Sequence, residues 1–381
     1  MSSKSEPEMY TIWKLLPLKN SKFWNHSLCV NATLIQDAAT EIMALELMND
    51  IPGFVQLRSA TVQQGVPTAL LLKIFENWTN DHPEDFESVD WGEDPLWLLA
   101  EMTDAGTDLE TLLSEGLPRY TFLNKQRKGA RLNLEQAWDI FFLTAEALAH
   151  GEQYARFEHR DLHPGNICIK KRDKKTKSPP RSPSVEYPKS QHVPTYTDIE
   201  VTIIDYTLSR AIVGGDQVLA PSMQDEELFK QRGKKPNDQR QYDMYRWMRD
   251  IFEGTPHPEG DTSELWKASI PMTNVRWLHH LLIILLQETE GFGKDGKGYK
   301  GKTEQRLAST LANLRTELAP ENVSKCDYLT ATDVIRSQLV NKAKMVEELI
   351  EEKINYPYEA QYMRELRAAR SERLRSAKSH S

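Results

Sequence analysis

The sequence predicts an α+β protein with a bilobal fold, in which a β-rich lobe precedes a mainly helical lobe. The first observation is a series of short apolar runs, which predict strands at 10–18, 54–63, 68–75 and 96–102. One amphipathic helix is expected among them, at 33–49. The second is a long amphipathic helix expected over 133–154, which leads into a polar loop. We therefore expect a first lobe at 1–102, a second lobe at 103–340 and a C-terminal helical extension at 341–381.

Composition restricts the class of protein. The 381 residues are 39% hydrophobic and 27% charged, which fits a soluble globular protein with one large core or two lobes. The longest apolar run, at 281–286, is too short to span a bilayer, and residues 1–8 lack the apolar core of a signal peptide. Three widely spaced cysteines indicate a reducing compartment, the cytosol or nucleus. The net charge of −8 argues against nucleic-acid binding by charge alone.

The polar loop at 157–166 carries the most informative motif. It reads Phe-Glu-His-Arg-Asp-Leu-His-Pro-Gly-Asn, so that Asp161 stands in a His-Arg-Asp context and Asn166 follows five residues later. This is the pattern of a kinase catalytic loop. Its chemistry needs an Asp that accepts the proton of an attacking hydroxyl. It also needs an Asn, a short loop away, that holds a metal ion to neutralise the transferred phosphate.

An apolar strand downstream of this loop ends in Asp205. In kinases the Asp that closes this strand binds the Mg²⁺ that bridges the phosphates, and the usual triplet Asp-Phe-Gly is Asp205-Tyr206-Thr207 here. An Asp at a strand end is more often a turn residue, but its place after the loop favours a metal ligand. Between the two motifs, residues 172–194 are basic and rich in Ser and Pro, and we expect a surface insertion in a hairpin.

Two further candidates lie in the first lobe. Lys14 stands in the middle of an apolar strand, where a kinase carries the Lys that pairs with the α- and β-phosphates. The alternative is a Lys that extends along the surface into solvent. The helix at 33–49 should then supply a Glu that holds this Lys. Glu41 and Glu46 both lie next to the apolar stripe, so the helical period does not choose between them, and a surface carboxylate is the alternative for each.

Several segments together resemble the haspin family of atypical serine/threonine protein kinases. The most specific is Ile-Ile-Asp-Tyr-Thr-Leu-Ser-Arg at 203–210, which follows the loop motif at 157–163. The segments at 222–229 and 242–246 resemble those that follow the Asp-Tyr-Thr triplet in haspins, and 277–279 and 331–333 resemble later landmarks. The resemblance covers about residues 10–340, with gaps. It implies the kinase-like version of the bilobal fold.

Carried over residue by residue, the resemblance implies a site for ATP and Mg²⁺. Lys14 would be the phosphate-pairing lysine, Glu41 its partner with Glu46 as the fallback, and Asp161 the catalytic base. Asn166 and Asp205 would bind Mg²⁺. Met102 would be the gatekeeper, and Thr103, Asp104 and Ala105 the hinge residues. Asp108 would lie near the ribose. The last three nucleotide-site residues would be neighbours of the metal ligands, namely His163, Tyr206 and Thr207. Asp243 would be a buried Asp that braces the catalytic loop.

The resemblance also implies a substrate and a setting. Haspins phosphorylate a threonine near the start of the histone H3 tail, and their activation segment is held by packing instead of phosphorylation. We therefore expect a monomeric protein kinase of mitotic chromatin, located in the nucleus with the cytoplasm as the other compartment, and without membrane contact. The basic insertion at 172–194 and the basic tail at 341–381 are candidates for chromatin contact; solvated charged surface is the alternative.

The sequence departs from the family pattern in two places. No glycine precedes Gly53, and the 13 residues before Lys14 reach about one strand's length at roughly 3.3 Å per residue. We therefore expect the glycine-rich loop and the first two strands to be missing, through an incomplete chain or a degenerate paralogue. Pro164 stands where haspins commonly have Trp. The alternatives are a catalytically impaired pseudokinase or binding scaffold, and a small-molecule phosphotransferase of the aminoglycoside or choline kinase type, whose loop is similar.

Overall fold

The computed structural model describes most of the chain between residues 11 and 339. The described ranges are 11–19, 33–81, 95–114, 132–172, 195–221, 226–254, 262–292, 299–322 and 328–339. Residues 1–335 form one unit, and the elements that carry the sequence motifs all lie in it.

A four-stranded sheet forms the first part of this unit. Its strands, in spatial order, are β2 (Thr33–Leu34), β1 (Thr11–Lys19), β4 (Leu96–Thr103) and β3 (Leu57–Gln64). β1 and β3 pair antiparallel with β4, whereas β2 runs parallel to the end of β1. Lys14 lies opposite Ala100 in this register. Since cross-strand partners share a face and strands alternate with a period of two, Lys14, Ala100 and Met102 lie on one face of the sheet.

Helix α1 (Ile35–Met48) packs against that same face. Its residues Ala38 and Ile42 contact Leu18 of β1 and Leu98 of β4 in a small apolar cluster. Glu41, one turn after Ala38, also points to the buried side of α1 and is only 3% exposed. The helix therefore presents a carboxylate to the face of the sheet that carries Lys14.

The strand expected at 68–75 is wrong, because these residues begin helix α2 (Ala69–Asp81). Thr68 starts the helix: its Oγ1 accepts a hydrogen bond from Leu71 N at 3.4 Å and its carbonyl accepts one from Leu72 N at 3.0 Å. The expected strand ended at Phe75, and a short apolar run fits either period. The helical spacing becomes visible only when Trp78 is added to Leu71 and Phe75.

A second, three-stranded antiparallel sheet follows the polar loop. Its order is β5 (Thr107–Asp108), β6 (Ile167–Lys171) and β7 (Ile199–Ile203), and β6 begins directly after the short 3-10 helix η1 (Pro164–Asn166). β6 and β7 pair with Ile167 opposite Ile203, so the expected hairpin is confirmed. The insertion residues 173–194, which connect its strands, lie outside the described residues.

The rest of the unit is mainly helical, with the long helix α4 (Leu134–Ala155) in its core. α4 begins at a capping box in which Asn133 and Gln136 exchange hydrogen bonds of 2.8 and 2.9 Å. It packs against β7, α7 and α8. The other elements are α3 (Leu109–Ser114), β8 (Ala211–Val213), β9 (Gln217–Leu219), α5 (Glu226–Lys230), α6 (Pro236–Glu253), η3 (Thr262–Lys267), α7 (Met272–Gln287), α8 (Lys302–Glu317) and α9 (Ala331–Leu339).

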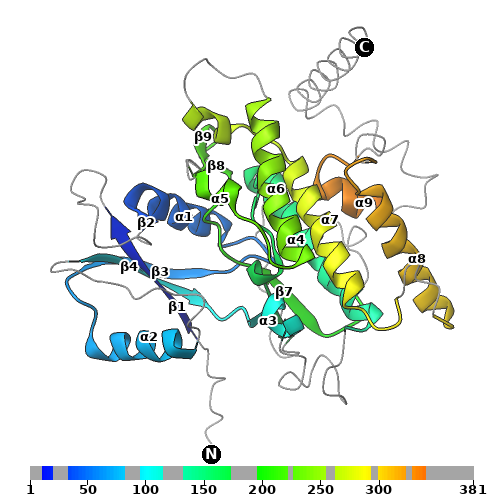
Figure 1. The fold of residues 1–381 in the computed structure, drawn as a ribbon, viewed down its shortest axis with the longest axis horizontal. Coiled ribbons are helices and arrows are strands. Elements are labelled where there is room, and N and C mark those ends of the chain that lie inside the picture. The colour runs from blue at the N-terminus through cyan, green and yellow to red at the C-terminus, as the bar shows by residue number, and fades with distance from the viewer. Residues whose placement is uncertain are drawn as a thin grey trace, which may run out of the picture. The chain divides into compact units, whose positions relative to one another are not determined.

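The mixture of helices and small sheets confirms the predicted α+β class. Figure 1 shows the strands β1, β3 and β4 with α1 in one part of the unit, and α4, α6, α7 and α8 gathered in another. The division into lobes at residue 103 stays a prediction, as does the helical tail at 341–381, which lies outside the described residues. Among the helices that the structure describes, none combines the length and apolar character needed to cross a membrane.

Candidate active site

The loop at 157–166 is held by the residues on both sides of Asp205. Glu158 and Arg210 exchange two backbone hydrogen bonds of 2.8 Å. The ring of His159 lies with Nε2 3.0 Å from the carbonyl oxygen of Ile204. Burial lowers the pKa of His159 to about 4, so the ring is neutral at pH 7. The loop motif at 157–166 and the residues around Asp205 therefore lie against each other, although they are far apart in the sequence.

Asp161 is held both through its backbone and through its carboxylate. Tyr245 of α6 donates a hydrogen bond from its hydroxyl to Asp161 Oδ1 over 2.5 Å. Asn166 Nδ2 donates to the backbone carbonyl of Asp161 over 2.8 Å. Burial raises the pKa of Asp161 to about 6, although His163 and the Tyr245 hydrogen bond act to lower it. A carboxylate with this pKa is suited to general-base work near neutral pH.

Lys14, Glu41 and Asp205 form a chain of ion pairs. Lys14 Nζ lies 2.6 Å from Glu41 Oε1 and 3.5 Å from Asp205 Oδ1. The Thr207 hydroxyl lies 2.5 Å from Asp205 Oδ1 and 3.2 Å from Glu41 Oε2, so it links the two carboxylates. Glu46 is exposed, so the structure brings Glu41 and not the fallback residue to the lysine. Three segments that are distant in the sequence thus meet at one point.

The charge states of this chain follow from its geometry. Burial acts to raise the pKa of Asp205, but the Lys14 ammonium and the Thr207 hydrogen bonds outweigh it and lower that pKa to about 2. Burial acts to lower the pKa of Lys14, but Asp205 and Glu41 raise it above its usual value. Asp205 is therefore an anion and Lys14 a cation over the whole physiological range.

Asn166 and Asp205 carry atoms that fit a hard divalent cation. Because Asn166 Nδ2 is used on the Asp161 carbonyl, the amide oxygen is the atom left for a metal. Asp205 adds an ionised carboxylate, and its backbone is held in the left-handed region at φ 59°. The Ile204 N–H donates to the Asn166 carbonyl over 3.0 Å, so the two residues lie on adjoining segments. Amide and carboxylate oxygens suit Mg²⁺, and the metal role of this pair stays a prediction.

The expected hinge residues follow β4 without a break. Met102 and Thr103 end this strand, and Met102 lies on its Lys14 face. The carbonyl of Asp104 accepts a hydrogen bond from Lys170 Nζ over 3.0 Å, and Ala105 is buried. Gly106, at φ +97°, brings this segment so close to β6 that an added Cβ would lie 2.4 Å from the Ile169 carbonyl oxygen.

Two residues at the far end of this segment have local partners. Asp108 begins α3, and its Oδ1 accepts a hydrogen bond from Thr111 N over 2.8 Å. His163 Nδ1 lies 3.1 Å from Gly165 N and 3.7 Å from Glu110 Oε2. Burial acts to lower the pKa of His163, but Glu110 and Asp161 outweigh it and raise that pKa. The roles assigned to Asp108 and His163 stay predictions.

One expectation from the resemblance requires correction, and another concerns a fully buried residue. Tyr206 is fully buried, and its role in the nucleotide site stays a prediction. Its ring packs edge-on against Phe54 and Phe157, and its hydroxyl donates to the Ile203 carbonyl over 3.0 Å. Asp243 is not a buried bracing residue, because its side chain is 58% exposed and its carboxylate pairs with Arg246. The Asp243 carboxylate instead forms an ion pair with a residue three positions later on the surface of its own helix.

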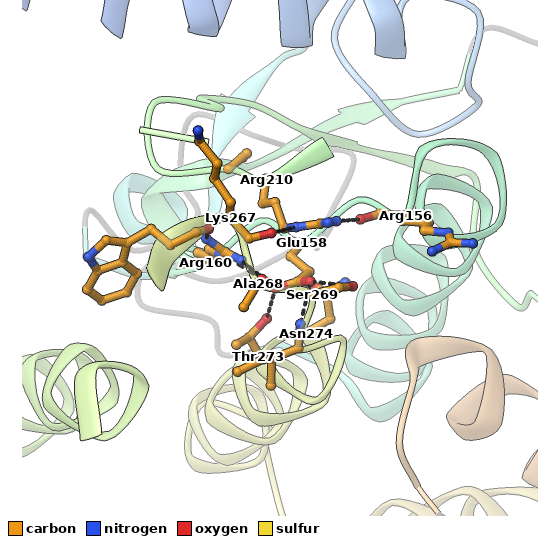
Figure 2. Close-up of polar contacts among 12 residues, drawn as sticks. Arg156, Glu158, Arg160, Arg210, Lys267, Ala268, Ser269, Thr273 and Asn274 are labelled. Carbon is orange, nitrogen blue, oxygen red and sulfur yellow. Dashed lines mark hydrogen bonds and ion pairs between the residues drawn. The ribbon is translucent and has the colours of Figure 1, made fainter. Parts of the chain in front are cut away.

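Figure 2 shows the buried network that fixes the loop instead. The side chains of Glu158 and Arg160 are both fully buried, and Arg160 donates two hydrogen bonds to Glu158 Oε2 over 2.9 and 3.1 Å. Arg160 also donates to the carbonyls of Trp266 and Ala268 over 2.6 and 2.9 Å. Glu158 Oε1 accepts from Ile270 N over 2.7 Å. The pair therefore ties the loop to the end of η3 and to the segment between η3 and α7.

Asn274, near the start of α7, holds the backbone of the same loop (Figure 2). Its Oδ1 accepts from His159 N over 3.0 Å, and its Nδ2 donates to the Phe157 carbonyl over 2.9 Å. Sequence reasoning missed Glu158, Tyr245 and Asn274. The only available signal was their polar character beside buried apolar neighbours, which does not identify a partner that lies far along the chain.

A family model described as a haspin like kinase domain matches residues 2–335. The chain belongs to the haspin-like kinase family. The resemblance that the motifs around Asp161 and Asp205 indicated is therefore confirmed.

Curated proteins similar to this haspin-like chain bear the same family name. A serine/threonine-protein kinase haspin homolog of Schizosaccharomyces pombe is 26% identical over 344 residues, which are 86% of this chain and 59% of that relative. A haspin homolog of Drosophila melanogaster is 29% identical over 248 residues, 64% of this chain and 36% of the relative. The serine/threonine-protein kinase haspin of Mus musculus is 28% identical over 303 residues, 77% of this chain and 33% of the relative. The chain thus spans 59% of the first relative and about a third of the other two.

Proposed function

We propose that this chain is a serine/threonine protein kinase that transfers the γ-phosphate of ATP to a protein hydroxyl. The observation that carries the proposal is the chain of ion pairs from Glu41 through Lys14 to Asp205. The Asp205 carboxylate is also close enough to affect the pKa of Asp161. A phosphate-pairing lysine, a metal-binding carboxylate and a base are the groups that phosphoryl transfer requires.

Each residue has a separate task in this proposal. Bound ATP and Mg²⁺ would supply the phosphoryl group and offset its charge. Lys14 would hold phosphate oxygens, while Glu41 fixes the position of the ammonium group. Asn166 and Asp205 would hold Mg²⁺ through their side-chain oxygens. Asp161 would orient the substrate hydroxyl and accept its proton, so that most of the rate acceleration comes from positioning.

A threonine in the histone H3 tail is the substrate that we propose, with nuclear chromatin in mitosis as its setting. A basic tail needs acidic groups near the site, and Glu110, whose side chain is 64% exposed, lies beside His163 on the catalytic loop. The overall charge of −8 has the same sign. The basic segments proposed for chromatin contact, at 173–194 and 341–381, lie outside the described residues. Fluorescence imaging of the tagged chain in dividing cells tests the location.

Replacing Asp161 with alanine is expected to reduce phosphate transfer about 10²–10⁴-fold, because the general base is lost. The full chain is incubated with Mg²⁺, radiolabelled ATP and a histone H3 tail peptide, and incorporation is compared with that of the variant. A peptide with alanine at each threonine is the substrate control. Nucleotide binding by both proteins, measured by calorimetry, shows that the site is intact.

The same assay decides between this proposal and the alternatives. Nucleotide binding without transfer to any protein substrate would support the pseudokinase or scaffold interpretation. Transfer to aminoglycosides or choline, with none to the peptide, would support a small-molecule phosphotransferase. Transfer to a general basic protein but not to the H3 peptide would keep the kinase assignment and reject the histone substrate.

The rate of transfer is expected to fall as the pH drops through about 6. Burial raises the pKa of Asp161 to about 6, and the base acts only when it is deprotonated, so activity is present above this pH and lost below it. Single-turnover rates between pH 5 and 8 test this, with ADP affinity measured at the same pH values as the control. A rate that stays constant across this range would contradict Asp161 as a base with this pKa.

A further inference from the structure

We propose that Tyr245 is a positioning residue that fixes the carboxylate of Asp161 for catalysis. This inference rests on the proposed function, because it gives Tyr245 a task only where Asp161 acts as a base. The Tyr245 hydroxyl lies 2.5 Å from Asp161 Oδ1, which is a short hydrogen bond to a carboxylate. The two residues are 84 positions apart, so the contact depends on tertiary structure.

The direction of this hydrogen bond is set by a third residue. Gln241, one turn earlier on α6, donates from Nε2 to the Tyr245 hydroxyl oxygen over 2.9 Å. Since that oxygen already accepts a hydrogen bond from Gln241, its own hydrogen is directed to Asp161. Burial and the Asp161 carboxylate both raise the pKa of Tyr245, so the phenol stays protonated and remains a donor.

Tyr245 is placed on a rigid support. It is 3% exposed, and its ring packs at 5.8 Å from that of Trp277 on α7 and at 6.0 Å from that of Tyr242. Met248 and Phe252, which follow on the same helix, are fully buried and anchor α6 in the core. A side chain locked by packing can hold a catalytic group within a fraction of an ångström.

The consequence for Asp161 is that its two carboxylate oxygens become different. Oδ1 is engaged by Tyr245, while the backbone carbonyl of the same residue is held by Asn166 and by His163 N over 2.8 and 3.0 Å. The loop and the carboxylate are then both fixed, and in this proposal Oδ2 receives the substrate hydroxyl. Fixing a base in one orientation lowers the entropic part of the barrier.

Asp243, a neighbour of Tyr245 on the same helix, lies on the opposite side of α6. The segment 242–246 contains Asp243, which the resemblance implied as the brace of the catalytic loop. Asp243 faces solvent, whereas Tyr245, two residues later, faces Asp161. Residues two apart on a helix point in directions about 200° apart, so both cannot face the loop. Within this segment, contact with the catalytic carboxylate belongs to the tyrosine.

A Tyr245→Phe variant tests the proposal, since it removes one oxygen and keeps the ring. We expect kcat to fall about 10- to 100-fold, as for loss of a hydrogen bond to a charged group. KM for ATP and the affinity for ADP should stay within about twofold, because the contact that Tyr245 makes in the site is with the general base Asp161 and not with the phosphate-pairing Lys14 or the hinge. Tyr242→Phe, the same change one turn earlier on α6, is the control and should keep the wild-type kcat.

Two variants of Gln241 separate positioning from packing. Gln241→Glu leaves the tyrosine in place but offers a carboxylate that competes with Asp161 for the phenolic hydrogen, so kcat should fall much as in Tyr245→Phe. Gln241→Met removes the donor without adding an acceptor, so its fall should be smaller. A kcat for Tyr245→Phe within twofold of wild type, or equal losses in both Gln241 variants, would overturn the proposal.

A measurement without activity keeps the two proposals apart. In a thermal-melting cycle, Tyr245→Phe should lower the Tm of the full wild-type chain but produce little shift in the Asp161→Ala background, because the shared hydrogen bond is already lost. Equal shifts in both backgrounds would show that the hydroxyl is not coupled to Asp161 and would reject this inference. Absence of phosphate transfer by the wild-type chain would instead reject the proposed function.

Discussion

Replacing Glu158 with alanine is expected to lower the free energy of unfolding by about 3–5 kcal/mol, as for a buried ion pair that loses one partner. Glu158 and Arg160 are both fully buried, so the variant would leave the Arg160 guanidinium without its counter-charge. The Oε1 partners, Ile270 N and Ser269 Oγ, would lose their acceptor as well. Unfolding by urea, followed by circular dichroism, measures the change.

The matched control is Glu200→Ala. Glu200 also pairs with a cation, Lys170, but the two atoms are 3.8 Å apart and both side chains are partly exposed. An exposed ion pair is worth about 0–1 kcal/mol, so this variant should unfold close to the wild type. If both variants lost a similar amount of unfolding free energy, burial would not make the Glu158–Arg160 pair more stabilising than an exposed ion pair.

The Glu158–Arg160 pair also bears on the expectation that the activation segment is held without phosphorylation. Arg160 uses Nε and both terminal nitrogens on Glu158 and on two backbone carbonyls. Four of the five N–H donors of this guanidinium are engaged, and the side chain is fully buried, so it is not available to a phosphate on the activation segment. That the segment is held without phosphorylation stays a prediction, and mass spectrometry of the active chain would test it.

The sequence alone indicates which residue types form the site, because each motif is local. Asp161 and Asn166 lie in one loop, and Asp205 closes one strand. The helical period does not choose between Glu41 and Glu46, since both flank the apolar stripe. The choice depends on which face α1 turns to the sheet, and the structure shows that Ala38, Glu41 and Leu45 share that face.

The surroundings that sequence reasoning did not anticipate depend on distant partners. Tyr206 belongs to an apparent nucleotide motif, yet Phe54 and Phe157 enclose its ring. Tyr245 reaches Asp161, and Asn274 reaches the loop backbone, from helices that follow the loop by more than one element. A local pattern contains no information on such contacts, because they form only when the helices pack.

Replacing Lys14 with methionine is expected to lower kcat about 10²–10³-fold, as for removal of one preorganised charged contact. The apolar stem of the side chain is kept, while the ammonium that lies 2.6 Å from Glu41 and 3.5 Å from Asp205 is lost. Initial rates of phosphate transfer to the peptide measure the effect. Glu46→Gln, a change of the same type on the exposed side of α1, is the control and should leave the rate unchanged.

The ion pair itself is tested by combining Lys14→Met with Glu41→Gln. Glutamine can still accept the hydrogen bond from Thr207, so this variant removes chiefly the charge that holds the ammonium. If Glu41 acts only through Lys14, the double variant should be no slower than Lys14→Met alone, because effects of residues that work as a unit do not add. Multiplicative losses would instead mean that Glu41 contributes to the rate independently of Lys14. The structure offers one such contribution, because Glu41 contacts Thr207, which in turn contacts Asp205.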